Sequence, residues 1–255
     1  MLFHRPEGRS GSLAYLDLPG PGSDVVVYLG GLGSASTVAF APVVHRRRQA
    51  GRSLVVDLLC SGWSDHDAAD MTIQAHADAV ASVVAASVEV PVSLVGHSLG
   101  GSVAIALAHR HPGLVSRLTV CEPNLDPGVG TFSSWVSSWS EEGFAAHGHR
   151  EVVEQLTRDA GAGDENAAEF ARTVARWSPR GLHRTAASLL ADRTPTFREQ
   201  LASLDLPRLL VSGDRDWEPQ PDLVDAGCAT AIVPDAGHVM MADNLDGFCA
   251  TLDRA

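Results

Sequence analysis

Short runs of β-branched residues alternate along this chain with longer Ala-rich stretches, and no other feature restricts the possible folds so strongly. The apolar runs lie at 24–29, 53–57, 92–95, 118–120, 209–211 and 231–233. Continuous runs of this kind are typical of parallel strands that are buried on both faces. The stretches between them, such as 72–86 and 99–110, have the composition of helices. The alternation predicts an α/β fold with a mostly parallel central sheet flanked by helices.

The alternation stops after Val120 and resumes only at Leu209. Within this interval Trp135 and Trp139 lie four residues apart, and 152–156 and 167–177 also have helical spacing. A connection of this length is uncommon as a loop in a compact domain. We therefore expect a helical cap over residues 126–192, inserted into a core formed by 1–125 and 193–255. Ligands of such sheets bind beyond the carboxyl ends of the strands, which a cap would cover.

Charge and composition exclude several classes of function. The chain has 31 acidic and 19 basic residues and a formal charge of −12, the wrong sign for gathering phosphates of nucleic acid. Every basic residue is Arg, so chemistry on a lysine amine is excluded. Neither a signal peptide nor an apolar run long enough to cross a membrane is found. We expect a cytoplasmic protein that acts on a small molecule, without nucleic acid, membrane, metal or cofactor. Four cysteines without C-x-x-C spacing are expected to be buried thiols: Cys60, Cys121, Cys228 and Cys249.

The segment Gly96-His97-Ser98-Leu99-Gly100-Gly101 follows the predicted strand at 92–95 and precedes the predicted helix at 99–110. It is a G-x-S-x-G motif in the strand–turn–helix context that gives this motif its meaning. Small residues on both sides of Ser98 permit the tight, strained turn that holds the hydroxyl at the edge of the sheet. Ser98 is therefore the candidate nucleophile.

A serine hydroxyl needs a general base, and the base needs a carboxylate to orient it. His238 follows the last apolar run at a turn that Gly237 introduces, and Asp216 follows the run at 209–211. The chain order Ser98, Asp216, His238 is that of the α/β-hydrolases. Glu122, two residues after the run at 118–120, is the rival for the acid. The G-x-x-D spacing favours Asp216, and this set predicts acyl transfer to water.

The order and spacing of these motifs resemble the α/β-hydrolase superfamily over essentially the whole chain. The resemblance implies an α/β-hydrolase fold whose cap is inserted after the sixth strand, and an oxyanion hole of backbone N–H groups. Carried over onto Gly30-Gly31-Leu32, it places one donor at Leu32 and the other at Leu99. Gly30 departs from the histidine that is usual in the family, so that side chain does not support the loop here. The resemblance implies a serine hydrolase of esters, lactones or thioesters.

The wall of the substrate pocket is expected to be largely apolar. Apart from Arg215, which precedes Asp216, no Arg lies next to the triad motifs, which favours a neutral, hydrophobic substrate. The candidate substrate-binding residues come from the triad loops and from the cap: Gly31, His97, Trp217, Val239 and Met240, with Trp135 and Trp139.

Two other functions are compatible with the same motifs. One is a receptor-like protein that keeps the fold and triad but binds a ligand with little turnover. The other is a biosynthetic enzyme that uses the oxyanion hole without hydrolysis. Fold resemblance alone does not separate them from a hydrolase. The natural substrate and the oligomeric state are left open by the sequence.

Overall fold

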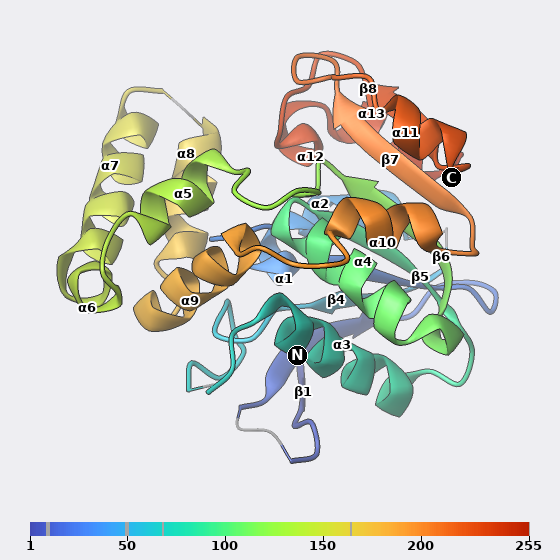
Figure 1. Cartoon of the computed structure of the whole chain (residues 1–255), viewed down its shortest axis with the longest axis horizontal. Helices are drawn as coiled ribbons and strands as arrows, with labels where there is room; N and C mark the ends of the chain where they lie inside the picture. The colour runs from blue at the N-terminus through green and yellow to red at the C-terminus, as the bar shows by residue number, and fades with distance from the viewer. Residues whose placement is uncertain (9–10, 49–50, 68, 164, 255) are drawn as a thin grey trace.

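A single sheet of eight strands runs through the part of the chain that the computed structural model describes, residues 1–8, 11–48, 51–67, 69–163 and 165–254 (Figure 1). The strand order is β1-β2-β4-β3-β5-β6-β7-β8. Strands β3 to β8 are parallel, whereas β2 is antiparallel to both β1 and β4. The strands are β1 (Leu2–His4), β2 (Leu13–Leu18), β3 (Val25–Leu29), β4 (Arg52–Val56), β5 (Val92–His97), β6 (Val115–Cys121), β7 (Arg208–Gly213) and β8 (Ala229–Val233).

The six predicted strands are confirmed as β3 to β8, with ends that differ by a few residues. Strands β1 and β2 were not predicted from the sequence. Strand β2 has no β-branched residue, and Tyr15 is the one residue in it of a type that favours strands, so its composition alone is a weak strand signal. Its pairing with β4 supplies the backbone partners that make it one.

Alternate residues of the parallel strands enter two separate apolar layers. In β3, Val27 and Leu29 belong to one core cluster, whereas Tyr28 belongs to the other. Leu94 and Val95 of β5 divide in the same way. Because successive side chains of a strand point to opposite faces, runs buried on both faces require helices on both sides of the sheet.

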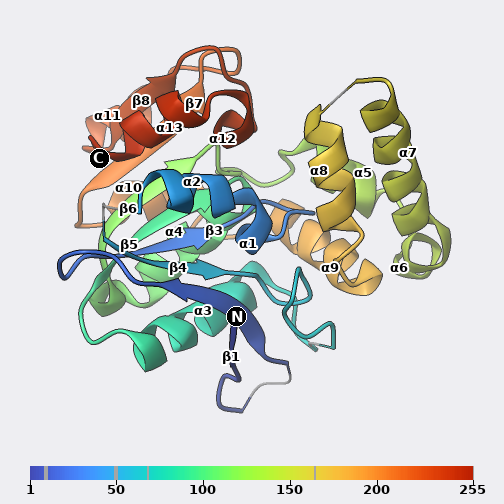
Figure 2. The ribbon, with the colours of Figure 1, turned by 180° about the vertical axis from the view of Figure 1, so that it is seen from behind.

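Helices cover both faces of the sheet, as the opposite views of Figures 1 and 2 show. On one face α4 packs against α3 and α10, and on the other α13 packs against α2. None of the described helices is long and apolar enough to cross a membrane. The helices of the core are α1 (Ser36–Ala39), α2 (Ala41–Arg46), α3 (Ile73–Ser87), α4 (Leu99–Arg110), α10 (Phe197–Ser203), α11 (Pro221–Asp225), α12 (Met240–Asp243) and α13 (Leu245–Leu252).

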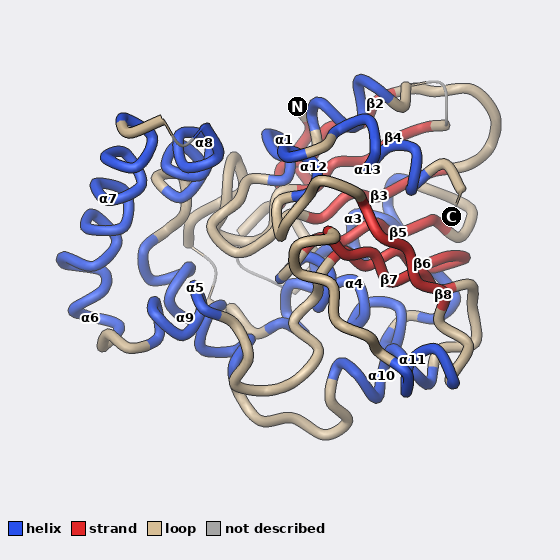
Figure 3. Tube along the Cα trace, turned by 90° about the horizontal axis from the view of Figure 1, so that it is seen from above, coloured by secondary structure: helices blue, strands red, loops and turns tan. Residues whose placement is uncertain are grey.

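A helical segment over residues 131–190, which we call the cap segment, lies between β6 and α10 in the chain. It extends to one side of the sheet in Figures 1 and 3. It contains α5 (Thr131–Ser137), α6 (Glu141–Gly143), a π-helical turn (Phe144–Gly148), α7 (His149–Gly161), α8 (Glu165–Val174) and α9 (Pro179–Leu190).

Polar contacts join the cap segment to α3. The ring of His76 lies 3.0 Å from Thr185 Oγ1, and the Ile73 N–H donates to Ser188 Oγ at 3.1 Å. His76 is completely buried, and its Nδ1 has no hydrogen-bond partner among the described residues. This burial lowers the pKa of His76 to about 4. The joint between cap segment and core therefore holds a neutral imidazole.

Candidate active site

Ser98 lies at the sharp turn between β5 and α4, with φ 52° and ψ −121°. This positive φ is a strained conformation for a residue with a side chain, and such strain is found where the surrounding structure enforces it. The flanking glycines explain how the turn fits. A Cβ on Gly96 would lie 2.3 Å from Gly100 O, and one on Gly100 would lie 2.2 Å from Leu29 O. The predicted motif thus forms a nucleophile elbow.

The carboxylate that contacts His238 is that of Glu122, not that of Asp216. His238 Nδ1 lies 2.7 Å from Glu122 Oε2, and the Gly213 N–H donates to Glu122 Oε1 at 2.9 Å. Glu122 follows β6 directly and has φ 44°, which turns the chain sharply at the carboxyl edge of the sheet. The expectation that Asp216 orients the histidine is therefore corrected. In the sequence, Glu122 was already recognisable as a candidate because it is an acidic residue at the end of a strand.

Asp216 lies in the exposed loop that follows β7. Its N–H donates to Gly213 O at 3.3 Å, while its neighbour Asp214 accepts from the N–H groups of Asp235 and Ala236. The G-x-x-D spacing therefore builds a turn that ties β7 to the loop before His238. Asp216 itself lines the same cavity as His238.

Glu122 is held in its charged form. Burial works to raise the pKa of this carboxyl, but its hydrogen bonds to His238 and to the Gly213 N–H outweigh burial, and the pKa is lowered. A carboxylate with a lowered pKa is ionised at neutral pH and accepts a hydrogen bond, so the contact with Glu122 favours the His238 tautomer that carries its proton on Nδ1.

His97 supports the loop that carries His238. Its Nε2 donates to the backbone oxygen of His238 at 2.7 Å, and the two rings lie 4.7 Å apart. Burial, with a smaller contribution from the charge of His238, lowers the pKa of His97 to about 3. His97 is therefore neutral across the physiological range and does not compete with His238 for a proton.

The two predicted oxyanion donors are backbone N–H groups without partners in the described part of the chain. Leu99 is the first residue of α4, where N–H groups have no acceptor within the helix. Leu32 lies in the turn that the Ser34 N–H closes by donating to Gly31 O at 3.0 Å. Gly31 lies beside Ser98, because a Cβ on it would be 3.3 Å from Ser98 Cβ. These placements are compatible with an oxyanion hole next to Ser98.

A cavity of about 1080 Å³ joins these groups. It contains Ser98 and His238 together with Glu122, and helices of the cap segment form its opposite wall. Of the residues expected to contact substrate, three line the cavity: Gly31, His97 and Val239. Leu32 lines it as well.

Four expected pocket residues are not among the described lining residues of this cavity: Trp135, Trp139, Trp217 and Met240. The rings of Trp135 and Trp139 pack against each other with centroids 6.3 Å apart, with Trp139 partly buried against the core cluster and Trp135 exposed at the surface. Met240 is completely buried in the core, and the adjacent Met241 faces the cavity instead. The helical spacing of the tryptophans indicated a common face but not what that face covers. Trp217 is partly buried in the loop that follows β7.

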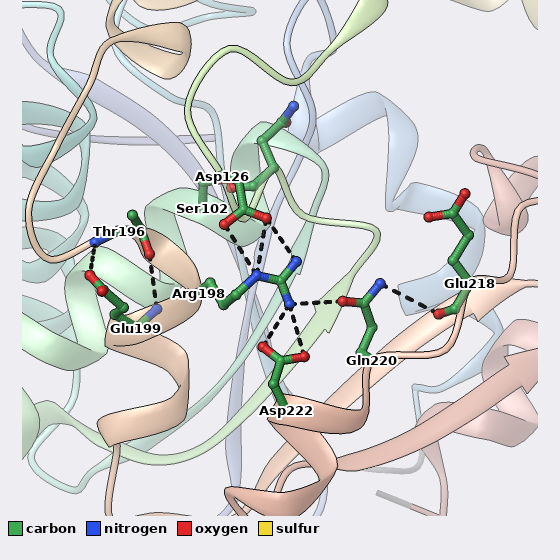
Figure 4. Close-up of polar contacts among 9 residues, drawn as sticks. Ser102, Asp126, Thr196, Arg198, Glu199, Glu218, Gln220 and Asp222 are labelled. Carbon is green, nitrogen blue, oxygen red and sulfur yellow. Dashed lines mark hydrogen bonds and ion pairs between the residues drawn. The ribbon is translucent and has the colours of Figure 1, made fainter.

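Arg198 of α10 lines the cavity and was missed by the sequence analysis. Its guanidinium binds Asp126 Oδ2 at 2.7 Å, Gln220 Oε1 at 2.8 Å and Asp222 Oδ2 at 3.0 Å (Figure 4). Two carboxylates thus offset its single positive charge. A lone Arg in a short helix carries no sequence signal, since only the fold brings the loops after β6 and β7 against α10.

Four further carboxylates line the cavity and form no ion pair within the described residues. We call them the acidic rim: Asp159 and Glu169 of the cap segment, and Asp216 and Glu218 of the loop after β7. Since Arg198 is already neutralised, the lining carries an excess of negative charge. The cavity lining is therefore only partly apolar, because it combines apolar walls with the carboxylates of the acidic rim.

Known proteins similar to this chain include both curated sequences and solved structures. An uncharacterised protein of Mycobacterium tuberculosis is 34% identical over 93 residues, which cover 36% of this chain and 27% of that protein. The chain thus spans about a quarter of the length of the curated relatives it matches first. A pimeloyl-[acyl-carrier protein] methyl ester esterase of Neisseria meningitidis is 28% identical over 197 residues, 68% of this chain and 72% of that protein.

Structural similarity extends over nearly the entire chain. The enol-lactonase of Burkholderia xenovorans LB400 superimposes with a TM-score of 0.82 at 19% identity, covering 99% of this chain and 98% of that one. At this identity the likeness concerns the fold. The model of the alpha/beta hydrolase family matches residues 18–251. With the sheet order, the elbow and the Glu122–His238 pair already in place, this match shows that the chain belongs to the alpha/beta hydrolase family.

Proposed function

We propose that this protein is a serine hydrolase that cleaves a carboxylic ester, lactone or thioester through an acyl-enzyme. One observation carries the proposal. Ser98 stands on a strained elbow in the same cavity as His238, whose Nδ1 is bound by the largely buried carboxylate of Glu122. A nucleophile, a base and a group that orients the base are the three parts that this chemistry requires.

In the proposed reaction Ser98 Oγ bonds to the carbonyl carbon while His238 Nε2 takes the hydroxyl proton. The carbonyl oxygen becomes an oxyanion, which the N–H groups of Leu32 and Leu99 stabilise. When the bond to the leaving group breaks, His238 returns the proton to that group. A water molecule then repeats the sequence on the acyl-enzyme and releases the acid. Glu122 stabilises the imidazolium formed in both halves.

The proposed substrate is small, largely apolar and carries no negative charge. Phe132, Leu156 and Phe170 of the cap segment give the cavity an apolar wall. The acidic rim repels anions and Arg198 is not free to bind them. The names of the similar proteins, an enol-lactonase and a methyl ester esterase, support ester or lactone chemistry.

We also propose that residues 126–192 act as the cap of a core formed by 1–125 and 193–255. All four cysteines are buried and none of them forms a disulfide. Cysteines that are not in disulfides support a cytoplasmic location.

The test is to label the protein with a fluorophosphonate and to measure the mass of the intact chain, for wild type and Ser98→Ala. Release of p-nitrophenol from neutral short and medium acyl esters is followed in parallel. One adduct that is lost in Ser98→Ala, together with many turnovers by wild type, is the expected result. A folded wild type that forms no adduct contradicts the proposal. An adduct without repeated turnover favours the receptor-like function instead.

A further inference from the structure

The turn that carries the Leu32 N–H has few restraints of its own. Gly30 and Gly31 precede Leu32, and Gly33 follows it with φ 81°. Glycine adopts many backbone conformations at little cost, so the direction of the Leu32 N–H depends on what holds the turn in place. One restraint is internal to the loop, where the Gly30 N–H donates to Ser36 Oγ at 2.8 Å.

A tryptophan of the cap segment holds the other end of this turn. Trp177, which lies between α8 and α9, donates from Nε1 to Ser34 O at 2.9 Å. Only 1% of Trp177 is exposed, so its indole is enclosed, whereas Ser34 is partly buried and lines the cavity. Next to it, the Ser178 N–H donates to Cys60 O at 2.9 Å, which ties the same part of the cap segment to the core.

Helix α8 also packs directly on the turn. A Cβ on Gly33 would lie 2.7 Å from Phe170 and 2.9 Å from Val174, so a larger residue at this positive φ would be strained and would have to displace these side chains. The turn is thus enclosed by the cap segment and tied to it by one directed hydrogen bond. Packing restricts its position, whereas the hydrogen bond fixes the orientation of its peptide groups.

We propose that Trp177 is a positioning residue for the oxyanion hole. By holding Ser34 O it fixes the turn from Gly31 to Ser34, and through it the direction of the Leu32 N–H. The oxyanion hole is then completed by a contact from the cap segment. This inference rests on the proposed function. Because the Leu32 donor serves the transition state, loosening it lowers kcat while KM changes little.

The test compares Trp177→Phe with Trp63→Phe. Trp63 is also a tryptophan at a contact between cap segment and core, beneath the guanidinium of Arg176 at 4.0 Å, but it does not line the cavity. Complete removal of an oxyanion donor costs about 10²–10³ in kcat, so a loosened donor is expected to cost about tenfold. Trp177→Phe is expected to lose this factor with an unchanged KM, and Trp63→Phe is expected to match wild type.

Inhibitor binding separates a positioning role from a role in packing alone, because loss of packing alone would not change the relative affinities for two matched inhibitors. Ser98 Oγ adds to the carbonyl carbon of a trifluoromethyl ketone, its proton passes to His238, and the ketone oxygen becomes an oxyanion. The matching methyl ketone binds without forming a stable adduct. In Trp177→Phe the affinity for the trifluoromethyl ketone is expected to fall by the same factor as kcat. The affinity for the methyl ketone is expected to stay unchanged.

A second replacement isolates the hydrogen bond. Incorporation of β-(3-benzothienyl)alanine at position 177 keeps the shape of the ring and replaces the N–H by sulfur, and it is expected to give the same loss as Trp177→Phe. Wild-type kcat in this protein overturns the proposal, as does an unchanged ratio of affinities for the two ketones in Trp177→Phe. In either case, labelling of Ser98 in wild type leaves the proposed hydrolase function standing. Absence of that labelling refutes both.

Discussion

Replacing Glu122 tests the active site most sharply. Its carboxylate lies 2.7 Å from His238 Nδ1, and 12% of its side chain is exposed. For charge centres about 4 Å apart and an effective dielectric constant of about 20, the attraction to the imidazolium is about 4 kcal/mol. Because 49% of the His238 side chain is exposed, water screens part of this attraction. A remainder of about 3 kcal/mol corresponds to roughly 10² in rate.

Loss of control over the histidine tautomer adds to this cost. The amide of Glu122→Gln can turn its NH₂ toward His238, which favours a proton on Nε2, where the base must be free. Such loss reduces kcat by up to about 10⁴ in a serine protease, so we expect a decrease of about 10²–10⁴ in Glu122→Gln.

The assay is kcat for a neutral p-nitrophenyl ester, with thermal unfolding measured on the same samples to verify that the variant is folded. Asp216→Asn is the matched control, since it removes a carboxylate of the same cavity that does not contact His238. We expect its kcat to stay within about threefold of wild type, as for a screened charge at the rim of the site. A folded Glu122→Gln with near wild-type kcat, together with an inactive Asp216→Asn, would refute the assignment and restore Asp216 as the acid.

Three further predictions follow from packing, burial and charge. A Cβ on Gly100 would lie 2.2 Å from Leu29 O, so Gly100→Ala is expected to lower the free energy of unfolding in urea by about 3 kcal/mol, and unchanged stability would contradict this packing. Folding lowers the pKa of His76 from 6.5 to about 4. Between these two pH values the unfolded chain binds a proton on this histidine and the folded chain does not, so the folded state loses stability as the pH falls. Between pH 6.5 and 5 wild type should therefore lose about 2 kcal/mol more unfolding free energy than His76→Gln, whereas equal losses would show that His76 is not the cause. For two matched esters that differ by one carboxylate, the acidic rim is expected to lower kcat/KM of the anionic one by about tenfold at low ionic strength, and a ratio that does not respond to salt would argue against it.

The parallel sheet and the nucleophile elbow were predictable from the sequence because both depend on local patterns. Runs such as Val25–Leu29 are apolar on both faces, which only a covered parallel strand satisfies. The glycines around Ser98 are required by contacts within the turn itself and with the neighbouring strand, so the motif and its geometry belong together. The position of His238 after the last strand of the sheet was predictable for the same reason.

The acid, the pocket wall and the charge of the cavity depended on tertiary structure. Asp216 and Glu122 both follow a strand, and only the arrangement of strands with the positive φ of Glu122 decides which carboxylate reaches His238. Trp177 is one of several tryptophans in the cap segment, and no spacing distinguishes the one that binds Ser34 O. Local patterns determine which residues form an element and which face they bury. Contacts between residues far apart in the chain, such as these, depend on how elements pack, which periodicity does not encode.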